Sequence, residues 1–387
     1  MNLPDPRSNS QATILLVDDT PDNLRLLSQI LAERNYKVRA VTTGQRALET
    51  AQLDPPDLIL LDIRMPGLDG FQVCTSLKID PKTRDIPVIF ISALDDVADK
   101  VKAFAVGGVD YITKPFQYEE VVARVETHLD LRRLQRQLER SNGRMAQELA
   151  LAGEVQATFM PERMPEIEGW QFAVKLQSAR QMSGDFFDMF TLPDGRMAIL
   201  VADVVDKGVS AALFMSLSYA LFRTFAQQHP GEPEKVFAAM NNHILHDTNA
   251  NQFVTAFYGI LDTNSGVMTY SNAGHPPPLI AAEGYGRRVR WLANTGVPLG
   301  IMVESAWQRR EVLIGRQDVL FLYTDGVIEA EAGPDSPFGM ERLLESAKLL
   351  LGQPADTIKE GVIADIRQFV GDRPLLDDLI LFVIKRD

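Results

Sequence analysis

The chain of 387 residues is 45% hydrophobic and 24% charged, with a formal net charge of -13. A chain of this length and hydrophobicity can form two or three domains with buried cores, and its composition excludes a disordered protein. The negative charge argues against a nucleic-acid-binding surface, which needs clustered lysine and arginine, so we expect no nucleic-acid partner.

The cysteine and histidine content sets further limits. A single cysteine excludes an internal disulfide and a cysteine-rich metal site, and it fits a reducing compartment. Five dispersed histidines give no indication of a zinc cluster. The start of the chain does not resemble a signal peptide, and no run approaches the roughly 20 apolar residues of a membrane span. We therefore expect a cytoplasmic protein with no membrane partner.

Residues 12–130 alternate short apolar runs with segments of helical periodicity. Continuous apolar strands separated by helices are typical of a doubly wound α/β domain, in which helices cover both faces of a parallel sheet. We therefore predict five parallel strands in this range. The expected helices span residues 23–34, 44–53, 70–79, 96–106 and 118–129.

Polar residues close four of these apolar runs: Asp18 with Asp19, Asp62, Ser92 and Lys114. The carboxyl ends of parallel strands share one edge of a sheet, so these side chains should converge on one crevice. Three carboxylates would repel one another unless a hard divalent cation such as Mg²⁺ joined them. A single aspartate in such a place is usually a turn or capping residue. Five positions in this order favour a site.

The chemistry of this crevice follows from its residue types. Asp62 is the candidate nucleophile, which would form an acyl phosphate. Lys114 supplies the counter-charge for a phosphoryl group, and the Ser92 hydroxyl can donate a hydrogen bond to one of its oxygens. The sequence therefore predicts a phosphate-accepting aspartate at this edge.

The same segment resembles the receiver domain of bacterial two-component response regulators. The resemblance rests on Val17-Asp-Asp19, Leu60-Leu-Asp-Ile-Arg-Met-Pro-Gly-Leu-Asp-Gly70, Ser92-Ala93 and Lys114-Pro-Phe116. It implies that Asp62 accepts phosphate from a sensor histidine kinase and binds Mg²⁺ together with Asp18 and Asp19. It also implies that Ser92 and Tyr111 form a switch pair. We expect the Lys114-Pro115 bond to be cis, a form that only X-Pro bonds adopt at low cost.

Residues 131–160 are predicted to form a helical linker. Apolar residues recur at 3-4 spacing, at Leu131, Leu134, Leu138, Met145, Ala152, Val155 and Phe159. This register fits a parallel two-stranded coiled coil and hence a homodimer. The alternative is a solvated helix that packs once against the following domain. Gly143 and Gly153 weaken a continuous helix, and Pro161 and Pro165 mark its end.

Residues 161–387 differ in pattern from the first domain. Several strand-like runs are interrupted by two long helical stretches, at 210–228 and 233–246, and hairpin-like turns separate some of the strands. This order predicts an α+β domain with mainly antiparallel sheets, an α-β-β-α sandwich.

Aspartates again lie at strand ends in this region: Asp185, Asp203, Asp325 and Asp377. Carboxylates from four distant segments can surround a pair of divalent cations, which clamp a phosphate and activate a bridging water. The pattern therefore indicates metal-assisted hydrolysis of a phosphate ester. Taken singly, an aspartate before glycine, as in Asp325-Gly326, is better interpreted as a turn residue.

As a set, these segments resemble the bacterial metal-dependent serine/threonine phosphatases of type 2C (PPM-type), in their SpoIIE/RsbU-like branch. The matching segments are Met182-Ser-Gly-Asp-Phe-Phe-Asp188, Ala202-Asp-Val-Val-Asp-Lys-Gly-Val-Ser-Ala-Ala-Leu213, Ser271-Asn-Ala-Gly-His-Pro-Pro-Pro278, Gly296-Val-Pro-Leu-Gly300, Thr324-Asp-Gly-Val-Ile-Glu329 and Asp377-Asp-Leu-Ile380. The resemblance implies two Mn²⁺ or Mg²⁺ ions. Their ligands would be Asp185, Asp203, the Val204 backbone carbonyl, Asp325 and Asp377, with Asp378 as the alternative to Asp377.

Two positions in this region need comment. Many relatives carry Ser-Gly where this chain has Val205-Asp206, which adds a carboxylate near the metals. His275 lies in a Gly-His-Pro sequence and is either a general acid or a structural turn residue; the prolines that follow it favour the structural role.

Together these segments predict a response regulator whose output domain is a metal-dependent phosphoserine/phosphothreonine protein phosphatase. By resemblance, its substrate would be a phosphorylated anti-sigma-factor antagonist in a partner-switching pathway. The alternative is a non-catalytic binding protein that sequesters a sigma factor or antagonist under control of phosphorylation.

Overall fold

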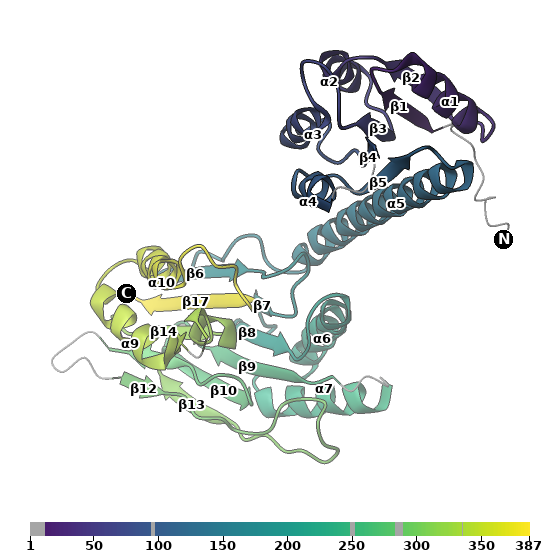
Figure 1. Cartoon of the computed structure of the whole chain (residues 1–387). Coiled ribbons are helices and arrows are strands. Elements are labelled where there is room, and N and C mark those ends of the chain that lie inside the picture. Colours follow the sequence, from purple (N-terminus) through teal and green to yellow (C-terminus); the bar gives the residue numbers. More distant parts are fainter. Residues whose placement is uncertain (1–11, 94–96, 248–251, 283–288, 335) are drawn as a thin grey trace. The chain divides into compact units, whose positions relative to one another are not determined.

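The computed structural model describes residues 12–93, 97–247, 252–282, 289–334 and 336–387 (Figure 1). The chain divides into two compact units, residues 1–143 and 144–387, which are described separately below. The division falls inside one long helix, α5, which spans Tyr118–Ala157. The domain boundaries predicted at 130/131 and 160/161 stay predictions.

The first unit is built on a five-stranded sheet in the order β2-β1-β3-β4-β5, and every pairing in it is parallel. Its strands are β1 (Thr13–Val17), β2 (Lys37–Val41), β3 (Leu58–Asp62), β4 (Val88–Ala93) and β5 (Asp110–Lys114). The doubly wound α/β fold predicted for this region is confirmed. The Lys114-Pro115 bond is cis, as expected.

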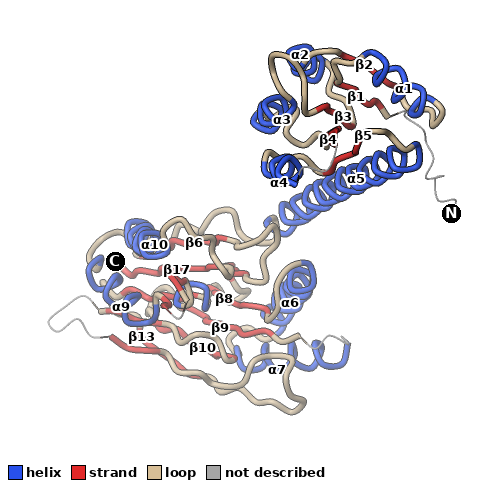
Figure 2. Tube along the Cα trace, viewed as in Figure 1, coloured by secondary structure: helices blue, strands red, loops and turns tan. Residues whose placement is uncertain are grey.

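Helices cover both faces of this sheet (Figure 2). They are α1 (Pro21–Ala32), α2 (Gly44–Leu53), α3 (Gly70–Ile79), α4 (Val97–Ala105) and the first part of α5. Side chains of α1 and α5, such as Leu27 and Val125, form one core with the sheet, and those of α2 and α3, such as Ala47 and Phe71, form the other. Because both faces are covered, every residue of β3 is buried.

Local signals explain the helix ends. The predicted bounds of α2 and α3 agree with the structure, since Thr43 caps α2 and Asp69 forms a capping box with Gln72. Helix α1 begins two residues earlier than predicted because Pro21 occupies its first turn, where its missing N–H costs nothing. The predicted start of the fourth helix, at residue 96, lies outside the described residues.

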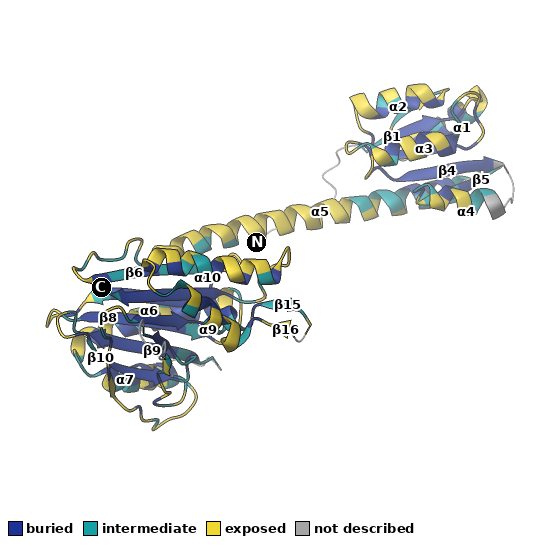
Figure 3. Cartoon of the chain, turned by 90° about the vertical axis from the view of Figure 1, so that its left-hand side faces the viewer, coloured by how far each residue is buried: buried dark blue, intermediate teal, exposed yellow. Residues whose placement is uncertain are grey.

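Helix α5 does not end at Leu129 but continues through both glycines to Ala157. Its early turns are attached to the first unit by Arg132, which donates to the Pro56 and Asp57 carbonyls, and by Arg136, whose guanidinium lies 3.1 Å from the Asp57 carboxylate. Much of its length after these contacts is exposed (Figure 3).

The second unit contains two five-stranded antiparallel sheets and a short hairpin. The first sheet has the order β13-β10-β9-β8-β7, with β7 (Phe186–Thr191), β8 (Met197–Val204), β9 (Val254–Leu261), β10 (Val267–Ala273) and β13 (Arg310–Leu313). The second has the order β12-β11-β14-β17-β6, with β6 (Trp170–Gln177), β11 (Leu279–Ala281), β12 (Val289–Trp291), β14 (Val319–Tyr323) and β17 (Leu379–Arg386). The hairpin pairs β15 (Glu331–Gly333) with β16 (Ser336–Pro337).

Helices complete four layers in this unit. They are α6 (Val209–Gln228), α7 (Pro233–Asp247), the single turn α8 (Asp325–Ile328), α9 (Gly339–Leu350) and α10 (Ala355–Val370). Side chains of α6 and α7, such as Phe222 and Phe237, pack against the first sheet. They belong to one continuous core that also includes the side chains between the two sheets. The outer face of the second sheet packs against α9 and α10. The predicted α-β-β-α sandwich is confirmed.

Within the described residues, α6 is the one helix whose length and hydropathy meet the requirements of a membrane span. Its Phe214, Met215 and Phe222 are buried against the first sheet, an arrangement typical of a core helix.

An ion pair ties α6 to β7 and yields a stability prediction. Asp188 is fully buried, and the Arg223 guanidinium donates to both of its oxygens, at 2.5 and 2.7 Å. Burial raises the pKa of Asp188, and Arg223 opposes that rise. Removing the arginine would leave the buried carboxylate uncompensated.

We expect Arg223→Leu to lower the free energy of unfolding of the second unit by about 3 kcal/mol. All three tryptophans lie in this unit, so tryptophan fluorescence during urea unfolding reports on it selectively. The double variant Asp188→Asn/Arg223→Leu should recover part of the loss, because no buried charge remains unpaired. A loss below about 0.5 kcal/mol for the single variant would contradict the assignment, since that is the size of an ordinary surface effect.

Candidate functional site

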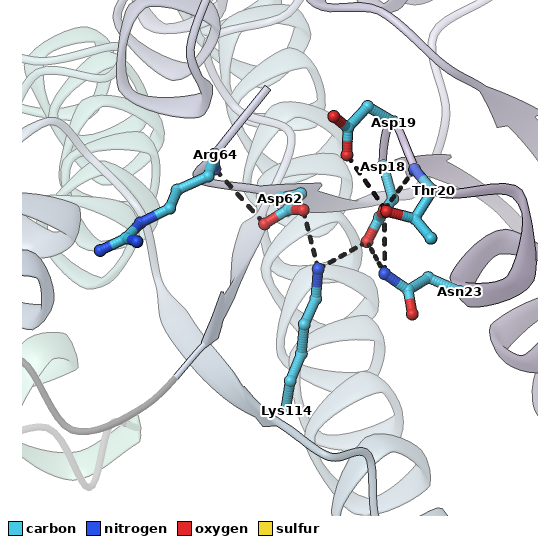
Figure 4. Close-up of polar contacts among 7 residues, drawn as sticks. All are labelled: Asp18, Asp19, Thr20, Asn23, Asp62, Arg64 and Lys114. Atoms are coloured by element: carbon cyan, nitrogen blue, oxygen red, sulfur yellow. Dashed lines mark hydrogen bonds and ion pairs between the residues drawn. The ribbon is translucent and has the colours of Figure 1, made fainter. Parts of the chain in front are cut away.

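Each unit carries a cluster of carboxylates at strand ends. In the first unit, Asp62 ends β3, Lys114 ends β5 and Asp18 directly follows β1. The Lys114 ammonium nitrogen lies 2.8 Å from Asp62 Oδ2 and 2.9 Å from Asp18 Oδ2 (Figure 4). One cation thus joins two carboxylates that the sequence separates by 44 positions.

The acidic pair after β1 is held by its own loop. Asp18 is fully buried and accepts hydrogen bonds from the Thr20 N–H and from the Asn23 amide. Asp19 is exposed, and one carboxylate oxygen from each of Asp18, Asp19 and Asp62 lies within 4.8 Å of the others. An all-oxygen group of this size suits a hard cation such as Mg²⁺.

Burial is the largest influence on Asp62 and raises the pKa of its carboxyl group. The Lys114 ammonium lowers the pKa of Asp62, whereas the nearby Asp18 raises it. Its Oδ1 accepts a long hydrogen bond, 3.4 Å, from the Arg64 N–H. Asp62 is therefore a carboxylate that Lys114 holds at the edge of the sheet.

The two residues predicted as a switch pair lie on neighbouring strands. Ser92 is buried near the end of β4, and Tyr111 lies on β5, where its ring packs edge-on against Phe104 at 6.2 Å between centroids. The Lys100 ammonium lies 4.6 Å from the centroid of the same ring. The coupling of Ser92 to Tyr111 stays a prediction.

In the second unit, four carboxylates come from four segments. Asp185 precedes β7, and Asp203 is the next-to-last residue of β8. Asp325 begins α8, and Asp377 lies shortly before β17. Asp185 and Asp203 lie close enough together for each to influence the pKa of the other. The structure therefore brings together the four aspartates that the sequence separates by as many as 192 positions.

Burial and mutual repulsion dominate the electrostatics of this cluster. Burial raises the pKa of Asp185 well above its usual value, and Asp203 raises it further. Burial also raises the pKa of Asp325 to about 7, with added contributions from Asp203 and Asp377. Anionic carboxylates packed in this way are destabilised by one another and favour a bound cation.

The donor atoms fit a divalent metal centre. Asp185 Oδ2 is buried and has no hydrogen-bond partner within the described part of the chain. A Cβ atom at Gly184 would lie 3.1 Å from the Val204 carbonyl oxygen, so glycine permits this carbonyl to approach the Asp185 segment. Carboxylate and carbonyl oxygens are the ligands that Mg²⁺ and Mn²⁺ prefer.

The neighbouring residues Asp377 and Asp378 have different surroundings. Asp377 Oδ2 lies 2.7 Å from the Lys207 ammonium. Both oxygens of Asp378 instead accept hydrogen bonds, from the Ala179 N–H, the Ser183 hydroxyl and the Gly184 N–H. This geometry favours Asp377 as the ligand and gives Asp378 the task of holding the Asp185 loop.

Sequence reasoning missed Gln156, which is buried near the end of α5. Its amide accepts from the Ser183 N–H at 3.0 Å and donates to the Ser183 carbonyl at 2.7 Å and to the Ala212 carbonyl at 3.4 Å. Ser183 in turn hydrogen-bonds to Asp185 and Asp378. A Cβ atom at Gly153 would lie 2.0 Å from the Gln181 carbonyl oxygen, which explains a glycine within this helix.

His275 is almost fully buried. Asn272 accepts from its N–H and donates to its carbonyl, and the Thr255 hydroxyl lies 3.0 Å from Nδ1. Burial lowers the pKa of His275 to about 3, so the ring is neutral near pH 7. These contacts favour the structural role over the general acid.

Comparisons with known proteins agree with this organisation. Residues 14–126 match the family described as response regulator receiver domain, and residues 193–387 match the family described as Stage II sporulation protein E (SpoIIE). The chain is 31% identical over 270 residues to protein IcfG of Synechocystis, which covers 62% of this chain and 42% of IcfG. It is 47% identical over 116 residues to the response regulator PleD of Caulobacter vibrioides, covering 30% of this chain and 26% of PleD. The chain thus spans less than half the length of either relative.

Among solved structures, the SiaA-PP2C domain of Pseudomonas aeruginosa superposes with a TM-score of 0.57 and 18% identity, covering 64% of this chain and 99% of that domain. This likeness supports the fold. Fold and sites together define a response-regulator receiver joined to a PP2C-type phosphatase domain. The chain belongs to the SpoIIE family, whose matched region makes up half of its length.

The loop that follows β8 contains a residue with a strained backbone conformation. Asp206 has φ +96°, in the region that favours glycine. Among the described residues, its carboxylate accepts from the adjacent Lys207 N–H alone, at 2.9 Å, which compensates for little of the strain.

We expect Asp206→Gly to raise the free energy of unfolding of the second unit by about 1 kcal/mol, because glycine adopts this conformation without a Cβ clash. Urea unfolding followed by tryptophan fluorescence measures the change. Asp206→Ala is the matched control, since it removes the carboxylate but keeps the Cβ atom and should not stabilise. Equal stabilisation by both variants would point to charge rather than backbone strain.

Proposed function

We propose that this chain is a response regulator whose receiver is phosphorylated on Asp62 and whose output domain is a metal-dependent phosphoserine/phosphothreonine phosphatase. The observation that carries the proposal is the second carboxylate cluster, where Asp185 has a buried oxygen with no hydrogen-bond partner in the described residues, near three further aspartates. A binding protein without catalysis has no need to bury such a group, because its cost is paid only if it ligates or reacts.

In the receiver, the Asp62 carboxylate attacks the phosphorus of a phosphohistidine on a sensor kinase. A new P–O bond forms, the P–N bond breaks, and the imidazole nitrogen takes up a proton. Lys114 balances the charge of the phosphoryl group that arrives at Asp62. Asp18, Asp19 and Asp62 would hold Mg²⁺, which when bound neutralises phosphoryl oxygens.

In the phosphatase domain, Asp185, Asp203, Asp325, Asp377 and the Val204 carbonyl would hold two Mn²⁺ or Mg²⁺ ions. Bound there, such ions lower the pKa of water and stabilise the charge of the reacting phosphate. A water oxygen bonds to phosphorus, the ester P–O bond breaks, and the serine or threonine oxygen leaves with a proton. The protein's own task is to fix the carboxylates, which the Asp378 and Ser183 hydrogen bonds achieve on one side.

The substrate we propose is a phosphorylated anti-sigma-factor antagonist, which would place this chain in a partner-switching pathway. The support is the membership of the SpoIIE family together with the sequence motifs of its RsbU-like branch.

We also propose a homodimer formed through α5. The seam residues Leu134, Leu138 and Met145 are exposed by 61, 62 and 61%, respectively, and follow a coiled-coil spacing. Exposed apolar side chains in such a register gain most from burial against an identical helix.

The continuous helix offers a route between the two sites. At one end Arg132 and Arg136 attach it to the first unit, and at the other Gln156 grips Ser183 in the loop that carries Asp185. A change in the helix or its dimer partner would thereby reach a metal-ligating segment through side-chain hydrogen bonds.

The enzymatic part of the proposal is tested with a phosphoserine peptide and an aryl phosphate in the presence of Mn²⁺. We expect turnover that disappears on chelation, and a decrease of at least about 100-fold in Asp325→Ala, since a direct metal ligand should matter more than groups that only hydrogen-bond to ligands. Asp194→Ala, in an exposed hairpin turn, is the control and should keep full activity. The enzyme proposal would be contradicted if the protein without substitutions hydrolysed neither substrate.

The regulatory part is tested with a small phosphodonor such as acetyl phosphate. We expect the unmodified protein to gain a phosphoryl group and to change its phosphatase rate by about fivefold or more, the range of ordinary allosteric coupling. Asp62→Asn should do neither, while Asp85→Asn, an exposed carboxylate elsewhere in the receiver, should behave as the unmodified protein.

Gln156→Ala separates phosphorylation from its effect. It should accept the phosphoryl group normally, because Asp62 is untouched, but its phosphatase rate should respond less. A full change of phosphatase rate in phosphorylated Gln156→Ala would exclude this residue from the route. An unchanged phosphatase rate after phosphorylation of the protein without substitutions would contradict the coupling proposal.

A further inference from the structure

A small pocket lies beside the second carboxylate cluster, between α10, the end of β6 and the start of β17. Its volume is about 220 Å³. Its floor is aliphatic, since Ile363, Ile366, Val370 and Leu379 line it and are nearly or fully buried. A floor of this kind accepts one apolar side chain of a peptide.

Two arginines give the pocket a basic rim. Arg367 lies in the last turn of α10, and Arg373 lies in the loop that follows the helix. Both are exposed, and neither forms an ion pair with any residue that the structure describes. Two guanidinium groups that line one pocket, without an ion pair in the described residues, form a local basic feature on a chain with a net charge of -13.

The backbone connects this pocket to the candidate metal centre. Leu379 of the pocket wall directly follows Asp377 and Asp378. Gln177, which pairs with Leu379 across β6 and β17, also lines the pocket and lies two residues before Ala179, whose N–H donates to Asp378. A peptide with its phosphorylated residue at the carboxylates can therefore reach the pocket with a segment close in its own sequence.

We propose that this pocket docks an acidic segment of the phosphoprotein substrate, in which one apolar side chain fills the aliphatic floor and neighbouring carboxylates pair with Arg367 and Arg373. The inference rests on the proposed phosphatase function and adds a specificity site to it. Guanidinium groups bind carboxylates through paired N–H donors, which suits an acidic residue rather than a purely apolar partner.

The net charge of the chain bears on the expected preference for acidic peptides. A net charge of -13 repels acidic peptides in general, so a preference for them must come from a local basic surface. Because the guanidinium groups are exposed, the gain should be modest and should fall with ionic strength.

The experiment compares two synthetic phosphoserine peptides that differ only in flanking residues, with Leu-Glu-Glu or Leu-Gln-Gln on each side. Binding is measured by fluorescence anisotropy of the labelled peptides, and turnover is measured with Mn²⁺. The unmodified protein should bind the glutamate peptide about three- to tenfold more tightly, with the difference in KM rather than kcat. The preference should shrink at high salt.

In Arg367→Glu/Arg373→Glu the preference should vanish or reverse, while hydrolysis of a small aryl phosphate stays unchanged. Arg367→Ala/Arg373→Ala serves as the milder variant and should also abolish the preference. Arg309→Glu/Arg316→Glu is the matched control, because it makes the same charge change at exposed arginines elsewhere in the domain.

Equal binding of both peptides to the unmodified protein would overturn the proposal, as would a preference that survives in the Arg367/Arg373 variants or is lost in the control. Binding is measured without turnover, so these outcomes are independent of catalysis. Failure of the phosphatase function itself would show differently, as no hydrolysis of peptide or aryl phosphate by any variant.

Discussion

The crowding of carboxylates at strand ends is the constraint on which both units depend. In the first cluster, Lys114 reaches Asp18 and Asp62 and supplies a permanent counter-charge. In the second, Lys207 pairs with Asp377 at the rim, and the buried Asp185 has no cation beside it in the described part of the chain. The first cluster is therefore stable as a metal-free resting site, whereas the second gains more from bound cations.

The structural role of α5 depends on contacts that the periodicity of its sequence cannot predict. Apolar spacing explains the exposed seam of α5, but a heptad pattern assigns no partner to Gln156. That side chain is buried because two backbone groups of Ser183, 27 positions away, need hydrogen-bond partners. A helix that enters the second unit in this way acts as part of the phosphatase fold as well as a spacer.

The fold was predictable wherever local signals agreed with the tertiary structure. Helices α2 and α3 match their predicted bounds because Thr43 and Asp69 cap them. The end of α5 was not predictable, since glycine at 153 signals a break unless the close approach of Gln181 is known. The site residues could be named from strand-end aspartates, but the left-handed conformation of Asp206 and the division of labour between Asp377 and Asp378 required the surrounding loops.

This division of labour follows from the different partners of two adjacent side chains. Just before β17, Asp377 pairs with Lys207 and lies near Asp203 and Asp325, whereas Asp378 accepts hydrogen bonds from the Ala179–Gly184 loop. In the proposed metal centre, one dipeptide would thus contribute a ligand, Asp377, and the support for another, Asp185. Leu379 then begins the strand and forms a wall of the arginine-rimmed pocket. A displacement of this short segment would move the proposed ligand Asp377, the Asp185 loop and the wall of the proposed docking pocket together, so the segment connects all three.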